Sequence, residues 1–313
     1  MSSRENNILL VITGPTATGK TRLAVLVAHA TGREVISADS RQVYRGMDLG
    51  SGKDLDDFLV EGRLVPYHLI DIAEPGAEYN VFEYQGDFLN AYRHIRSRNS
   101  QAILCGGTGM YIEAAIKGYR MLKVPKNLPL RSQLSPMTME ELSKILARFG
   151  PLHNTTDTGD RERLVRAIEI QEYQKTHSGL MKDYPVLNPK LFAIHFDRAI
   201  LRQRITERLD RRLAAGMTRE IEQLLKKGLK PSQLVFYGLE YRYVTRYVVG
   251  EISWDQMVTQ LNTAIHQFAK RQMTWFRRME RRGTPIQWID GRLPEEEKMR
   301  QVIEKAGLQP LGS

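Results

Sequence analysis

The segment Asn7–Gly32, "NILLVITGPTATGKTRLAVLVAHATG", decides the fold. Ile8–Ile12 is an apolar run of strand length, and Thr21–Ala30 has the apolar periodicity of a helix. Between them, Gly14–Thr21 satisfies the pattern G-x-x-x-x-G-K-[ST] in full. A loop of this kind between a strand and a helix holds a phosphate, because its backbone N–H groups and the helix N-terminus face the anion. An accidental glycine-rich turn is the alternative, and the flanking strand and helix disfavour it.

We expect the whole loop to bind phosphate groups. Lys20 should reach the outermost phosphate, and the Thr21 hydroxyl should ligate Mg²⁺. The expected phosphate-binding residues are Gly14, Pro15, Thr16, Ala17, Thr18, Gly19, Lys20 and Thr21. The pattern leaves open whether the phosphate belongs to a nucleoside triphosphate or to another compound.

Composition favours a protein of the reducing cytoplasm with a polyanionic partner. The chain has 313 residues, a net charge of +10 and a pI near 9.6. Several basic clusters contain aromatic residues, which favours RNA over the alternative of solvated helix faces. The single cysteine, Cys105, excludes an internal disulfide and a cysteine-based metal cluster. No apolar run approaches the ~18 residues of a membrane span, and the polar N-terminus lacks the core of a secretory signal. We expect a cytoplasmic monomer.

The order of elements predicts an α/β fold with a mostly parallel, P-loop NTPase-like sheet flanked by helices. Candidate strands alternate with helical stretches, and they span residues 7–13, 34–39, 67–72, 101–107 and 191–196. Residues 120–188 have a different texture, with prolines followed by helical patterns at 138–150 and 160–179, and we interpret them as a small helical insertion domain. The core would then comprise residues 1–119 and 189–313, with a mainly helical C-terminal part.

Two further loops should meet the phosphate-binding loop. Asp39 follows the second candidate strand, and Thr108 follows the fourth. Because ligands of parallel sheets bind beyond the carboxyl ends of the strands, all three loops should converge on one edge. Helix or turn capping is the alternative role for Asp39, and a tight turn is the alternative for the glycines around Thr108.

Five segments taken in order resemble the tRNA dimethylallyltransferase family, also called tRNA isopentenyltransferase. They are "GPTATGKT", "DSRQVY.GMD.G..K", "CGGTGMY", "DRERLVRAIEI" and "FAKRQMTWFRR", and they extend from about residue 8 to residue 290. The resemblance implies transfer of a dimethylallyl group from dimethylallyl diphosphate to N6 of adenosine 37 in tRNA. It also implies that the P-loop grips a diphosphate that departs, not ATP.

The resemblance assigns roles to individual residues. Lys20, the loop amides and Mg²⁺ on Thr21 would stabilise the leaving diphosphate, together with Thr108 and an arginine. Arg208 is the best match for that arginine, and Arg204 is the alternative. Asp39 would act as general base toward N6. The residues that match tRNA-contacting segments are Asp39, Ser40, Arg41, Gln42, Glu162, Arg163, Leu164, Val165, Arg166, Tyr241 and Arg242. For Arg163 and Arg166 the alternative is an exposed pair on an amphipathic helix.

The chain departs from the family pattern at several positions. Ser51 and Gly52 replace threonine and alanine, Glu240 stands at a position usually held by glycine, and His266 lies in a segment that is usually more basic. These departures concern tRNA contacts more than the catalytic matches.

Three other functions remain open from the residues alone. The first is a P-loop kinase or NTP-dependent RNA-binding protein, for which Asp71 could be the acidic partner of the nucleotide's metal. The second is an isopentenyltransferase acting on free adenine nucleotides, and the third is a non-catalytic RNA-binding module. The basic C-terminal helices disfavour the second, and the complete P-loop with Asp39 disfavours the third.

Overall fold

A computed structural model describes residues 8–150, 159–177 and 184–311 of the chain. These residues form two compact units. One unit extends up to Gly118 and resumes at Val186, and the other is Tyr119–Pro185. The polar N-terminus and the last two residues of the helical pattern at 160–179 lie outside the described residues. Among the described residues no helix is long and apolar enough to cross a membrane.

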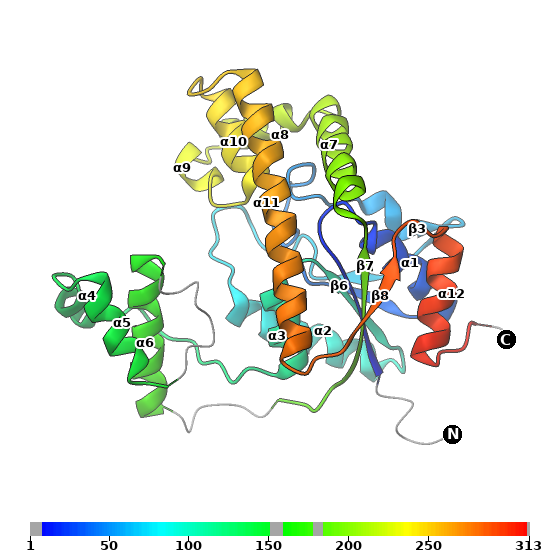
Figure 1. Cartoon of the computed structure of the whole chain (residues 1–313), viewed down its shortest axis with the longest axis horizontal. Helices are drawn as coiled ribbons and strands as arrows, with labels where there is room; N and C mark the ends of the chain where they lie inside the picture. The colour runs from blue at the N-terminus through cyan, green and yellow to red at the C-terminus, as the bar shows by residue number, and fades with distance from the viewer. Residues whose placement is uncertain (1–7, 151–158, 178–183, 312–313) are drawn as a thin grey trace. The chain divides into compact units, whose positions relative to one another are not determined.

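A six-stranded parallel sheet forms the centre of the larger unit (Figure 1), which confirms the predicted fold class. Its strand order is β5-β2-β6-β1-β7-β8. The strands are β1 (Ile8–Thr13), β2 (Glu34–Ser37), β5 (Tyr67–His68), β6 (Ala102–Gly106), β7 (Asn188–His195) and β8 (Ile286–Asp290). The central strand β1 is flanked by β6 and β7, and all but the first of its residues are buried, because helices cover both faces.

Some helices of this unit cover the two faces of the sheet, and the others form a helical cluster beyond it. The helices next to the sheet are α1 (Lys20–Thr31), α2 (Val81–Ser97), α3 (Gly109–Lys117) and α12 (Glu295–Ala306). Those of the cluster are α7 (Arg198–Ala214), α8 (Met217–Lys226), α9 (Pro231–Leu234), α10 (Leu239–Val248) and α11 (Trp254–Arg281). Figure 1 shows the long helix α11 running from this cluster to α3.

The sheet and the cluster have separate hydrophobic cores. Leu10, Ile12 and Phe192 pack against α1 and α12. Ile205, Tyr241 and other apolar side chains of α7, α8, α10 and α11 pack together in the second core. A short hairpin of β3 (Leu59–Val60) and β4 (Arg63–Leu64) follows the 3₁₀-helix η2 (Leu55–Phe58).

The smaller unit is a three-helix arrangement of α4 (Leu128–Leu134), α5 (Met139–Ala147) and α6 (Arg161–His177). Its core contains Leu142 and Leu164, both completely buried. The buried carboxylate of Glu169 accepts hydrogen bonds from Arg131 and from the backbone N–H of Asn127, at 2.7 and 2.9 Å to the same oxygen.

The structure differs from the sequence prediction at three elements. The strand predicted at 67–72 ends at His68, because Leu69 and Asp71 have φ values of 62° and 56°, which no strand accommodates. Helix α4 forms in the proline-containing stretch that showed little periodicity, with its second residue a proline. Strand β8 and helix α12 were not predicted, and β8 completes the sheet by pairing with β7.

Candidate active site

The P-loop folds as the sequence predicts, between β1 and α1. Gly14 has φ 149°, and a Cβ there would lie 2.9 Å from the carbonyl oxygen of Ile194, so only glycine fits. Gly19, the N-cap of α1, has a left-handed φ of 82°. The Lys20 ammonium lies 3.4 Å from the Pro15 carbonyl, and the Thr18 hydroxyl donates to the same carbonyl.

The three loops converge on one edge of the sheet, as predicted. The N–H of Thr108 donates to the carbonyl of Ala38, and the N–H of Ser40 donates to the Thr108 hydroxyl at 3.1 Å. Thr108 occupies the N-cap position of α3 but makes no side-chain cap, because its hydroxyl faces the loop after β2. A Cβ on Gly106 would lie 2.2 Å from the Ala38 carbonyl oxygen, so glycine allows the two loops to touch.

Asp39 stands at this edge, half-buried, with one carboxylate oxygen accepting the N–H of Arg41 at 2.9 Å. It also lies within electrostatic range of Lys20. Burial lowers the pKa of the Lys20 ammonium, the charge of Arg208 lowers it further, and Asp39 acts in the opposite direction. An anion beside Lys20 would relieve this unfavourable environment.

Gln272 on α11 was not assigned a role from the sequence, although it lies inside the quoted segment "FAKRQMTWFRR". Its side-chain oxygen accepts the N–H of Thr16 at 2.9 Å, and its side-chain nitrogen donates to the carbonyl of Gly107 at 2.9 Å. One side chain therefore joins the P-loop to the loop after β6. Its position in a basic helical segment was the only signal available.

Helix α7 brings arginines to the P-loop. Arg208 donates to the Thr16 hydroxyl and to the Asp54 carboxylate, both at 3.0 Å. Arg204 instead donates to the Ala17 carbonyl at 3.0 Å and stacks over the ring of Phe196. Of the two candidates for the diphosphate arginine, Arg208 is the one whose charge acts on the Lys20 ammonium.

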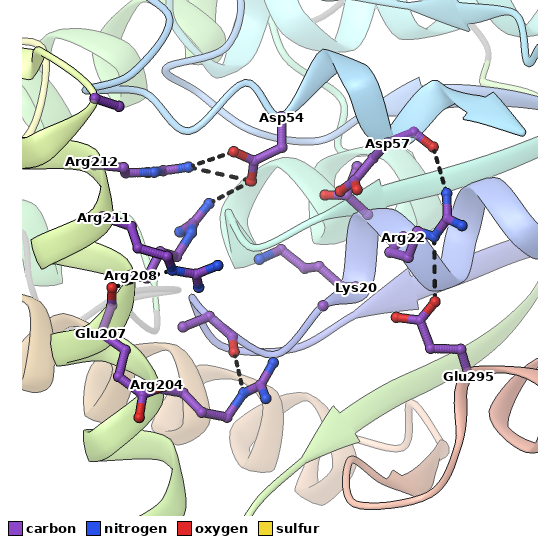
Figure 2. A pocket seen from close by; sticks show the side chains of 14 residues that line it. Lys20, Arg22, Asp54, Asp57, Arg204, Glu207, Arg208, Arg211, Arg212 and Glu295 are labelled. Carbon is purple, nitrogen blue, oxygen red and sulfur yellow. Dashed lines mark hydrogen bonds and ion pairs between the residues drawn. The ribbon is translucent and has the colours of Figure 1, made fainter.

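A cavity of about 580 Å³ opens beside the P-loop (Figure 2). Its lining residues are predominantly charged: Ala17, Gly19, Lys20, Thr21, Arg22, Asp54, Asp57, Arg204, Glu207, Arg208, Arg211, Arg212, Ala215 and Glu295. In Figure 2, Lys20 extends toward the centre, between Asp57 and the arginines of α7. The six basic side chains, four of them from α7, suit an anion with several negative charges.

Asp71, the candidate acid of a P-loop kinase, does not line this cavity. Its carboxylate forms an ion pair with the buried ammonium of Lys53, which also contacts Asp48 at 2.9 Å. The main chain of Asp71 is held by Gln42 and Arg45. The kinase alternative thereby loses the acid that the sequence assigned to it.

Two of the residues expected to contact tRNA from the core are committed to internal contacts. Tyr241 is completely buried, and its hydroxyl donates to Glu220 at 2.6 Å, so its ring is part of the core. The Gln42 amide accepts from Ser37 and donates to Gly52. Arg242, in contrast, is exposed. The structure therefore corrects the expectation for the Tyr241 ring, because burial removes it from any RNA surface.

The residues of the insertion that were expected to contact tRNA also divide into those with internal contacts and those that are exposed. Leu164 and Val165 are buried in its core, which corrects the expectation that their side chains contact tRNA. Arg166 donates to the carbonyl of Val124 at 2.7 Å and to Glu169 at 3.1 Å. Glu162 and Arg163 are exposed.

Comparison with known families finds a match to the IPP transferase family over residues 42–279 and to the isopentenyl transferase family over residues 7–65. The chain belongs to the IPP transferase family. A Bacteroides fragilis protein named tRNA dimethylallyltransferase 2 is 52% identical over 297 residues, covering 95% of this chain and 97% of that protein. Parabacteroides distasonis has a tRNA dimethylallyltransferase 1 that is 54% identical over 295 residues, covering 94% of this chain and 96% of that protein.

Family membership confirms the resemblance drawn from the sequence. Among solved structures, a tRNA isopentenylpyrophosphate transferase from Bacillus halodurans matches this IPP transferase with a TM-score of 0.69 and 26% identity, covering 96% of this chain and 98% of that one. The similarity spans both the P-loop core and the insertion. The fold of this IPP transferase is therefore that of its family over nearly the whole length.

Proposed function

We propose that this IPP transferase transfers the dimethylallyl group of dimethylallyl diphosphate to N6 of adenosine 37 in tRNA and releases diphosphate. The observation that carries the proposal is that a P-loop, a set of arginines and the half-buried Asp39 meet at one edge of the sheet, in a chain whose relatives are named tRNA dimethylallyltransferases. One chain supplies all of these groups, so the proposal is for a monomer. Its working compartment would be the cytoplasm.

The P-loop side of the site would bind the donor and stabilise its leaving group. As the allylic carbon–oxygen bond breaks, negative charge accumulates on the diphosphate. The loop amides, Lys20 and Arg208 would offset that charge. The Thr108 hydroxyl accepts the N–H of Ser40 and lies on the loop after β6, which Gln272 joins to the P-loop, and it would contribute a further polar contact.

Mg²⁺ fits this pocket only with help from the substrate. The described residues contain no cluster of three or more histidine, cysteine or acidic ligands. Thr21 and Asp57 both line the cavity, and burial, followed by the charge of Asp54, raises the pKa of Asp57, so a cation beside it would be favourable. Mg²⁺ commonly binds through one or two protein groups plus substrate phosphates. Thr21 would hold the ion, which would neutralise charge on the diphosphate when bound.

Asp39 would serve the acceptor. The N6 amino group is a weak nucleophile because its lone pair is conjugated with the ring, so removal of its proton during C–N bond formation assists attack. Adenosine 37 must leave the base stack to reach this carboxylate. Exposed basic residues, including Arg163 and Arg242, would hold the surrounding RNA.

Incubation with labelled dimethylallyl diphosphate, Mg²⁺ and total tRNA tests the proposal. We expect label at N6 of adenosine after digestion to nucleosides. Lys20→Ala and Thr21→Ala should reduce labelling sharply while tRNA affinity in a gel shift stays near that of the unchanged chain. ATP turnover without any labelled nucleoside would instead establish an NTP-dependent function, and labelling of free adenine nucleotides but not tRNA would establish the small-acceptor alternative.

A further inference from the structure

Two of the positions at which the chain departs from its family's pattern lie next to the same guanidinium group, that of Arg212. Gly52 has φ 79°, and a Cβ there would lie 2.9 Å from both terminal nitrogens of Arg212 and from one of Arg208. Glu240 lines a small cavity with Arg208 and Arg212. Gly52 therefore makes room for a second arginine one helical turn beyond Arg208 on α7.

Among the charged side chains that line the P-loop cavity and form ion pairs, Arg212 is the most buried. Its side chain is 10% exposed, against 27% for Arg208 and 48% for their shared partner Asp54. Its guanidinium donates to the two Asp54 oxygens at 3.0 and 3.3 Å. Arg208 donates to one of the same oxygens at 3.0 Å. Two cations thus share one carboxylate, as Figure 2 shows.

The electrostatics favour an anion between Arg208 and Arg212 that carries more negative charge than one carboxylate. Burial lowers the pKa of Arg212, and the neighbouring charge of Arg208 lowers it further, against the opposing effects of Asp54 and Glu240. Burial alone would raise the pKa of Asp54, but the two arginines bring it below its ordinary value. A diphosphate carries more charge than Asp54 and offers several oxygens to two planar guanidinium groups.

The three side chains also differ in how firmly they are held. Arg208 and Arg212 are on a 17-residue helix, and Arg208 is tied to the P-loop through Thr16. Asp54 precedes η2 in a loop and is about half exposed. The Asp54 side chain can therefore turn away into solvent without disturbing α7 or η2.

We propose that Arg212 is a second diphosphate-binding arginine and that Asp54 is a stand-in anion, which the diphosphate displaces from Arg208 and Arg212. This inference rests on the proposed function, since it places the diphosphate in the P-loop cavity. Before the donor binds, Asp54 keeps two buried like charges together in the binding geometry. After transfer, Asp54 competes for the same arginines and assists release of diphosphate.

Binding of inorganic diphosphate to the full chain, measured by calorimetry with and without Mg²⁺, tests the inference. Arg212→Gln should weaken binding about tenfold or more, because it removes a charge-assisted contact. Arg212→Lys should lie between, since an ammonium keeps the charge but not the two-pronged geometry. Asp54→Asn should strengthen binding, because it removes the competitor. A purely structural ion pair predicts the opposite sign for Asp54→Asn, so the sign separates the two roles.

The matched control is the arginine–carboxylate pair Arg246–Glu251 on α10 and the turn after it, at 3.1 Å and outside the cavity. Arg246→Gln and Glu251→Gln should leave diphosphate affinity unchanged. Thermal unfolding identifies any variant that fails to fold, and if Arg212→Gln is one, the Arg212→Lys and Asp54→Asn results decide.

Three results would overturn the inference. These are unchanged affinity in a folded Arg212→Gln variant, weaker binding in Asp54→Asn with or without Mg²⁺, and no diphosphate binding by the unchanged chain. Only the last also removes the support for the proposed function. Loss of diphosphate binding in Lys20→Ala, together with unchanged diphosphate binding in Arg212→Gln, would overturn this inference and leave the proposed function in place.

Discussion

The carboxylate of Asp39 accepts a single backbone N–H, that of Arg41, and no described residue donates to its second oxygen. Capping of the turn, the alternative considered from the sequence, therefore uses one oxygen and leaves the other available. Asp39 lies at the end of β2, beside Thr108 and within electrostatic range of Lys20. Its second oxygen can therefore act on a group that binds at this edge of the sheet. A turn cap and a general base are compatible in one side chain.

Asp39→Asn tests this role at the scale of one atom. The amide oxygen keeps the hydrogen bond from Arg41, but the group no longer accepts a proton at neutral pH. Loss of a general base should slow single-turnover transfer by about 10²–10⁴. Diphosphate affinity and tRNA affinity should be retained. A transfer rate near that of the unchanged chain would remove Asp39 from the role of base.

At the scale of elements, α11 is placed by close contacts with glycines. A Cβ on Gly109 would lie 2.2 Å from the ring of Trp275, and one on Gly107 would lie 2.6 Å from the Gln272 amide. The glycines after β6 therefore admit α11 to the edge of the sheet, where Gln272 joins the P-loop to the loop after β6. Packing against α11 is enough to explain these glycines, without any direct contact to a ligand.

Gly109→Ala should destabilise the core, because the added methyl would overlap the indole of Trp275. The expected loss is about 1–3 kcal/mol in the free energy of unfolding, measured by denaturant titration. The matched control is Gly86→Ala in α2, where a Cβ meets nothing within 4 Å. That substitution should stabilise by about 0.4–1 kcal/mol through the unfolded chain. Equal effects of the two substitutions would contradict the packing explanation.

Within the insertion, the buried carboxylate of Glu169 joins α6 to α4 through Arg131. Burial alone would raise its pKa, but Arg131, the N–H of Asn127 and Arg166 outweigh this and hold the pKa at about 2, below the ordinary 4.5. A lowered pKa means that the stabilisation is fully present above the ordinary value. It should be lost as the pH falls from about 4.5 toward 2.

Glu169→Gln should therefore weaken this unit at neutral pH, by about 1–3 kcal/mol, because two partly exposed arginines lose charge-assisted hydrogen bonds to a buried carboxylate. Hydrogen exchange of the α6 amides reports this locally. Their protection should drop in the variant at pH 7, and in the unchanged chain the same drop should appear only in acid. Acid-insensitive protection in the unchanged chain would mean that the ion pair contributes little.

At the scale of the whole molecule, the net charge of +10 should make tRNA binding steeply dependent on salt. The exposed side chain of Arg163 has no hydrogen-bond or ion-pair partner among the described residues, whereas Arg166 is occupied by Val124 and Glu169. The charge available to RNA therefore differs between two arginines that the sequence presents as equivalent. Salt dependence distinguishes an available charge from one that is already paired.

Arg163→Gln should flatten the slope of log affinity against log salt by about 0.7, the value for one single-stranded phosphate. Arg166→Gln should act mainly on the stability of the insertion, and Arg300→Gln on α12, an exposed arginine that is already paired with Glu297, should leave the slope unchanged. tRNA affinity at several salt concentrations measures all three. An unchanged slope for Arg163→Gln would assign this arginine to a solvated face.

The sequence by itself determined the strand–loop–helix around the P-loop, the parallel sheet and the positions of Lys20, Asp39 and Thr108 at its edge. These features follow from local order: apolar periodicity sets each element, and chain order places the residue after a parallel strand at the carboxyl edge. The family resemblance added the chemistry of the substrates.

Only the tertiary structure decided which charges are free and which are paired. The addition of β8 to the sheet, the bridge made by Gln272 and the sharing of Asp54 by Arg208 and Arg212 all join residues distant in the chain. An arginine has the same helix preference whether it faces solvent, a carboxylate or a phosphate. Its local sequence therefore carries no signal of its partner, and the partner is set by packing between segments that meet only in the folded chain.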